Sequence, residues 1–111
     1  MTVPQDPANC YLHAMIRIRN GRMSFFVEHF GEILPFFTDV LNWNLVSAGQ
    51  CLTGRPGWIF HLWAIPDPNS VLNARRLLAE HDAYAKLADC VEEMTQEIMI
   101  PMPYMPYTGS R

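Results

Sequence analysis

A single histidine stands in the middle of a strongly apolar segment of the chain. The segment WIFHLWAI runs from Trp58 to Ile65 and carries His61 between two tryptophans. A histidine can accept or donate a proton near neutral pH, and burial lowers its pKa, which keeps the imidazole neutral and able to act as a base. The alternative is a buried histidine bonded to a backbone carbonyl or to a partner subunit. His61 is the first candidate catalytic residue.

Further side chains suited to acid–base or charge chemistry lie on the first predicted strand, YLHAMIRIR, residues 11–19. Alternation separates its aliphatic side chains from His13, Met15 and Arg17. We expect this strand to neighbour that of His61, with His13 and His61 on the same side of the sheet. Arg17 could hold a carboxylate, phenolate or enolate by charge-assisted hydrogen bonds, or form a salt bridge at the rim or between subunits.

Several other chemistries have no sequence signal. No HxH, HExxH or Cys/His cluster gives metal-ligand spacing, and no GxSxG motif or glycine-rich phosphate loop occurs. The three cysteines are widely spaced, which favours reduced thiols in a cytoplasmic protein. A net charge of −3 argues against nucleic-acid binding, and no apolar run reaches membrane-spanning length. We therefore expect no metal, no cofactor, no nucleic acid and no membrane partner.

Hydrophobic periodicity predicts the elements that position these side chains. A helix over residues 23–41 carries an apolar stripe and contains Pro35, at which we expect a kink. A second helix over 70–79 follows a proline-rich breaker. Three strands cover residues 11–19, 43–51 and, after a hairpin loop over 53–57, residues 58–65.

The last third of the chain is predicted to be a further helical piece followed by a proline-rich end. Asp82 can cap the helical piece. Residues 98–107 hold three prolines, which permit only an edge strand or an extended tail. Residues 1–10 and 108–111 are a lead-in and a tail around one domain, residues 11–107. The positions with helical spacing are Tyr84, Leu87 or Ala88, Val91, Met94 and Ile98.

The predicted order of elements is β-α-β-β-α-β. Right-handed crossovers place both helices on one face of a single antiparallel sheet, which is the ferredoxin-like arrangement of α+β proteins. Nothing in the chain remains to cover the other face. Because a sheet with one bare apolar face is expected to pair with a second copy, we predict a homodimer.

Four segments resemble NIPSNAP-like proteins. They are YLHAMIRIRNG, EILPFFTDV, GWIFHLWAIPD and IMIPMPYMP, in this order, within about residues 11–107. NIPSNAP-like proteins belong to the dimeric α/β-barrel superfamily, which includes antibiotic-biosynthesis monooxygenases and polyketide cyclases. The resemblance implies two sheets packed face to face, with a cavity between sheet and helices or along the barrel interior. It also implies that Trp63 lines this cavity and that His61 points the same way.

The resemblance draws attention to two further places. Related barrel enzymes hold polar catalytic or substrate-orienting groups where the second helical region breaks, and His81 and Tyr84 stand at that break here. The alternative is a solvated helix terminus for His81 and a core position for Tyr84. Family members often carry a charged residue in the middle of the first strand, whereas this chain has Ala14.

Together these residues predict a small cofactor-independent enzyme of secondary metabolism. It would act on an apolar aromatic or polyketide-type molecule by acid–base chemistry, in a cyclisation, isomerisation or oxygenation. The alternatives are a non-catalytic homodimeric module that binds a ligand or assists an enzyme, and a haem-binding protein. The predicted catalytic residues are His61, His13 and His81, and the predicted substrate-binding residues are Trp63, Arg17, Met15, Tyr84 and Trp58.

Overall fold

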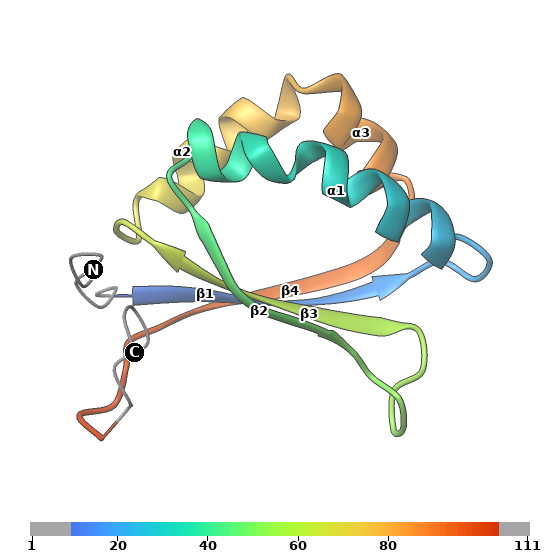
Figure 1. Cartoon of the computed structure of the whole chain (residues 1–111), viewed down its shortest axis with the longest axis horizontal. Coiled ribbons are helices and arrows are strands. Elements are labelled where there is room, and N and C mark those ends of the chain that lie inside the picture. The colour runs from blue at the N-terminus through green and yellow to red at the C-terminus, as the bar shows by residue number, and fades with distance from the viewer. Residues whose placement is uncertain (1–9, 105–111) are drawn as a thin grey trace, which may run out of the picture.

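A computed structural model describes residues 10–104, which form one curved sheet with the helices gathered on a single face (Figure 1). The strands lie in the order β2-β3-β1-β4, and every neighbouring pair is antiparallel. This is the predicted ferredoxin-like α+β arrangement. The elements are β1 (Cys10–Ile18), α1 (Met23–Asp39), β2 (Asn44–Gln50), β3 (Trp58–Ile65), α2 (Ser70–Ala79), α3 (Asp82–Ala88) and β4 (Val91–Met99).

The core lies between the sheet and the helices. Strand β3 alternates between half-buried and buried side chains along its whole length, and β1 buries its aliphatic face in the same layer. Helix α1 closes this layer with the stripe Phe26, Ile33 and Phe37. In the strands the apolar residues alternate, and in the helix they recur with the helical period. Both patterns predict that the apolar strand face packs against the apolar stripe of the helix.

Helix α1 continues through Pro35 to Asp39. The proline has no N–H to donate to the carbonyl of Gly31, and Gly31 is exposed on the outer side of the helix. The unpaired carbonyl therefore lies where water reaches it, and the helix tolerates the proline. Of the helices within residues 10–104, none has the combination of length and apolar character needed to cross a membrane.

The prediction of helix beyond Ala88 is wrong. Residues 91–99 form β4, which pairs with β1 from Tyr11 to Ile18 and is an edge strand. Val91, Met94 and Ile98 do fit a helical period, but pairing with the free edge of β1 determines the conformation instead. Met94, Gln96 and Ile98 share one face of β4. Because Gln96 is polar, the alternation of apolar residues that would indicate a strand is not apparent in the sequence. Of the predicted edge strand over 98–107, residues 105–107 lie outside the described part of the chain.

Candidate functional site

The register between β1 and β3 determines which face each candidate side chain occupies. His61 lies opposite Ala14, and Trp63 lies opposite Leu12. Directly opposed residues of an antiparallel pair share a face, so His61 and Trp63 point toward the helices together with the aliphatic face of β1. His13 lies opposite Leu62 and points to the other face. The expectation that His13 and His61 share a side of the sheet is therefore wrong.

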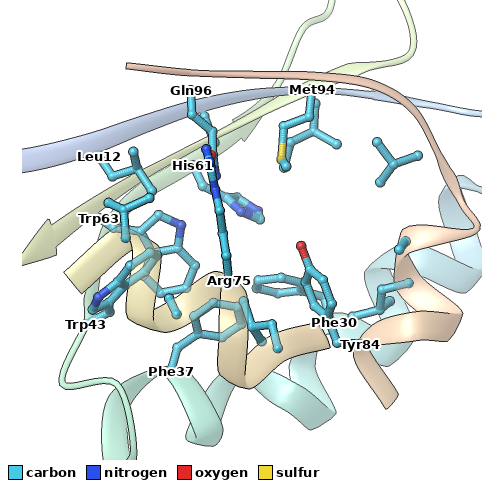
Figure 2. Close-up of a pocket in the computed structure, with 18 of the residues that line it drawn as sticks. Leu12, Phe30, Phe37, Trp43, His61, Trp63, Arg75, Tyr84, Met94 and Gln96 are labelled. Carbon is cyan, nitrogen blue, oxygen red and sulfur yellow. The ribbon is translucent and has the colours of Figure 1, made fainter. Parts of the chain in front are cut away.

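A cavity of about 320 Å³ lies between this face of the sheet and the three helices (Figure 2). Trp43, Trp63 and Phe37 gather at one end of it, where the Phe37 and Trp63 rings stack at 4.6 Å between centroids. Sheet residues on its wall include Leu12, Ala14, Ile16, His61, Trp63, Met94 and Gln96, and helix residues include Phe26, Phe30, Phe37, Ala74, Arg75, Leu78, Tyr84 and Leu87.

Small side chains flank His61 on both neighbouring strands. Ala14 of β1 and Ala48 of β2 lie opposite it, and Ala14 in turn lies opposite Gln96 of β4. One row across the sheet is therefore Ala48, His61, Ala14 and Gln96. Of the two alanines, Ala14 is buried and lines the cavity beside the imidazole, whereas Ala48 is exposed on the edge strand and lies outside the lining.

The surroundings of His61 are aromatic. Its ring centroid lies 4.7 Å from that of Phe30 and 5.8 Å from that of Trp63, and the residue is 6% exposed. Burial lowers the pKa of His61 from 6.5 to about 4, because the charged imidazolium loses its hydration there. None of the side-chain hydrogen bonds among residues 10–104 involves this ring. At neutral pH the cavity thus contains a neutral imidazole.

Three more polar side chains reach the cavity. The hydroxyl of Tyr84 points into it (Figure 2), and burial raises the pKa of Tyr84, while the charge of Arg75 acts in the opposite direction. Arg75 of α2 donates a hydrogen bond from Nη2 to Oε1 of Gln96, 2.8 Å away on β4. Neither Arg75, which belongs to no motif, nor Gln96, which lies in a segment with helical spacing, is among the residues predicted from the sequence.

The predicted site residues Met15, Arg17 and Trp58 do not line the cavity. They lie on the open face of the sheet, where Arg17 is opposite both Trp58 and Glu93. An Arg17 nitrogen lies 3.7 Å from a Glu93 carboxylate oxygen in an exposed pair. The alternative prediction for Arg17 is a salt bridge, and this ion pair is a contact of that kind.

His13 and His81 also lie away from the cavity lining. Nδ1 of His13 is 3.9 Å from Oε1 of Glu97 on the open face, and the His13 ring lies 6.0 Å from that of Phe60. The His81 ring packs edge-on against Phe36 at 4.7 Å. Its Nδ1 is buried and has no hydrogen-bond partner within residues 10–104. The structure therefore brings together His61, Trp63 and Tyr84 of the eight predicted site residues.

Within the described residues, no group of three or more His, Cys, Asp or Glu side chains could hold a metal ion.

The fold is similar to several solved structures. A NIPSNAP family protein from Agrobacterium tumefaciens has a TM-score of 0.74 at 20% identity, over 87% of this chain and 96% of that one. A NIPSNAP-like domain protein from Burkholderia xenovorans has a TM-score of 0.70 at 18% identity, over 87% and 88% of the two chains. A candidate antibiotic biosynthesis monooxygenase from Bordetella bronchiseptica has a TM-score of 0.71 at 16% identity, over 84% and 96%.

No family model and no curated protein matches the sequence. At these identities the structural likeness is one of fold. The chain has the ferredoxin-like fold seen in NIPSNAP family proteins and in candidate antibiotic biosynthesis monooxygenases, as its sequence segments predict.

The burial of His61 predicts a pH dependence of stability. The folded-state pKa of about 4 lies below the ordinary value of 6.5, so between these values the unfolded chain binds more protons than the folded chain. The free energy of unfolding should therefore be highest above pH 6.5 and fall as the pH approaches 4. The shift corresponds to a loss of roughly 3 kcal/mol. Urea unfolding at a series of pH values measures it.

The variant His61→Phe should lose this part of the pH dependence, because the group that takes up the proton is gone. The matched variant His13→Phe, on the opposite face, should retain it, because it keeps His61. Equal slopes of stability against pH in His61→Phe and wild type would show that the imidazole is not held neutral by burial.

Proposed function

We propose that the protein is a cofactor-independent enzyme that binds a flat, apolar aromatic or polyketide-type molecule in the cavity and transfers a proton through His61. The observation that carries this proposal is a neutral imidazole on an aromatic cavity wall, free of side-chain hydrogen bonds among residues 10–104. A neutral imidazole with an available lone pair is a competent proton acceptor.

The low pKa of His61 restricts when it accepts a proton. In the empty cavity an imidazolium is unfavourable because it is poorly solvated. When a bound substrate loses a proton to the ring, the enolate or phenolate that forms is an opposite charge beside it, which stabilises the imidazolium. Tyr84 keeps its proton, since burial raises its pKa, and it can donate a hydrogen bond to the developing oxyanion. Proton transfer is thereby coupled to substrate binding.

The reaction class in this proposal is a cyclisation or isomerisation of an electron-rich ring, or its oxygenation with molecular oxygen as the co-substrate and oxidant after His61 has removed a proton. The likeness to a candidate antibiotic biosynthesis monooxygenase supports oxygenation among these, while a NIPSNAP structure from Agrobacterium tumefaciens is described as having unknown function. His13 and His81 have no part in the mechanism proposed, since neither lines the cavity. A cytoplasmic location stays a prediction.

A second proposed role is that of a ligand-binding module without turnover. The observation that favours it is the close packing of His61 on Phe30, which would fix the ring as part of an aromatic wall. In that case the imidazole contributes shape and stacking, and a phenyl ring can replace it.

Turnover of His61 variants separates the two roles. The change is His61→Phe, assayed against a panel of hydroxylated aromatic polyketides by mass spectrometry, with binding followed by calorimetry. An enzyme should lose at least about a hundredfold in rate, the usual contribution of a general base, while it still binds. His29→Gln is the control and should keep the wild-type rate, because His29 is half-buried beside Phe25 on α1 and does not line the cavity. Binding without turnover in the wild type, or full turnover in His61→Phe, would contradict proton transfer by His61.

We also propose that the open face of the sheet packs against a second copy of the chain. Met15, Trp58, Phe60 and Leu62 lie on this face and are half-buried in the single chain, with no helix over them (Figure 1). Apolar side chains on a sheet face that no helix covers favour association. The charged pair of Arg17 and Glu93 would lie at the rim of such an interface.

If the open faces of two copies pack together, a charge introduced on this face should prevent the association. Light scattering of the wild-type protein at micromolar concentration should give twice the chain mass, and Phe60→Asp should give a monomer because the charge would be desolvated at the interface. The matched variant Leu72→Asp, on the exposed side of α2, should remain dimeric. A wild-type monomer would rule out this interface.

A further inference from the structure

The cavity wall holds one formal charge. Among the cavity-lining residues in the described chain, Arg75 is the only Arg, Lys, Asp or Glu. Most of the other lining side chains are aliphatic or aromatic. The polar ones are neutral at pH 7, because burial lowers the pKa of His61 and raises that of Tyr84, and Gln96 is an uncharged amide. Any ligand in this space therefore meets a mainly apolar surface with a single cationic group.

The charge of Arg75 is not compensated by a carboxylate within residues 10–104. Its hydrogen bond goes to the neutral amide oxygen of Gln96, whereas Arg17 and Arg19 both pair with glutamates of β4. A guanidinium has five N–H donors in a planar fork that matches a carboxylate. The contact with Gln96 thus holds the side chain in place and leaves further donors for an anion.

Arg75 stands where the cavity meets solvent. The lining residues that are exposed, Arg75, Ala79, Ala88 and Met94, come from α2, α3 and β4, so the mouth lies between these elements. Figure 2 shows the Arg75 side chain extended from α2 toward Gln96, between the aromatic end at Trp63 and the opposite end at Tyr84. An anionic group can reach this position without full burial, which limits its desolvation cost.

We propose that Arg75 binds an ionised acidic group of the cavity ligand, whose apolar rings lie against Trp63 and Phe37. This inference rests on the proposed function and narrows its substrate class to flat aromatic acids. The acidic group displaces or joins Gln96 at the guanidinium and fixes the orientation of the rings, so that one edge faces His61. Arg75 is a binding residue in this account, and it determines specificity for anions over neutral molecules of the same shape.

The probe is a matched pair of small molecules, 2-naphthoate and 2-naphthamide, which share a ring system and differ in charge. Calorimetry of the wild-type protein should show naphthoate binding at least about tenfold more tightly, the usual effect of one charge-assisted hydrogen bond. Arg75→Gln should bring the two affinities together. Arg76→Gln removes the same charge from the next residue of α2, whose side chain bonds to Asn73, and should keep the preference.

Gln96→Glu gives an independent test with Arg75 intact. A carboxylate at this position would pair with the guanidinium and compete with the anionic ligand, so the ratio of the naphthoate affinity to the naphthamide affinity should fall toward one. Equal affinities in the wild type, or a preference for naphthoate that survives in Arg75→Gln, would overturn the role of Arg75 and leave ligand binding by the cavity intact. Failure of both compounds to bind would overturn this inference together with binding of aromatic molecules in the cavity.

Discussion

The pairing register of β1 with β3 is the constraint on which the site depends. It sets Ala14 beside His61, with Ala48 on the other neighbouring strand, and directs the imidazole under the helices. A shift of one residue would exchange the two faces of β3, so that, for example, Phe60 and Leu62 replaced His61 and Trp63 in the core. Ala14, whose side chain is a single methyl group, lines the cavity beside the imidazole.

Desolvation then gives the cavity its chemical character. The aromatic wall removes water from His61, which lowers its pKa, and from Tyr84, which raises its pKa. Both effects keep these groups neutral, so Arg75 provides the positive charge of the cavity. The cavity thus combines a neutral base, His61, with a protonated phenol, Tyr84, and a cation at its mouth, Arg75. These groups suit a ligand that carries or develops negative charge at one edge, because the phenol and the cation can stabilise that charge. The three groups come from β3, α3 and α2, and only the packed fold assembles them.

The sequence predicts the fold better than the site. The alternation of β3 and the stripe of α1 follow from periodicity. The start of α2 follows from the proline-rich breaker before it, and the order of elements gives the sheet topology. The exception is β4, where a free strand edge overrides the helical spacing of Val91, Met94 and Ile98. Periodicity separates the two faces of a strand, but it does not say which faces of β1 and β3 coincide. Alternation alone therefore does not reveal that His13 and His61 lie on opposite faces, which follows from the pairing of Ala14 with His61. Arg75 and Gln96 meet only in space, 21 positions apart, and no local pattern could have linked them.

The most direct test of this account is an NMR titration of the His61 ring in the wild-type protein, with His61→Phe used to assign its signals. We predict that the imidazole stays neutral through neutral pH and titrates at about pH 4, and that 2-naphthoate shifts its ring resonances. Titration near the ordinary value of 6.5, with no response to the ligand, would mean that His61 is solvated and lies outside a ligand-binding cavity.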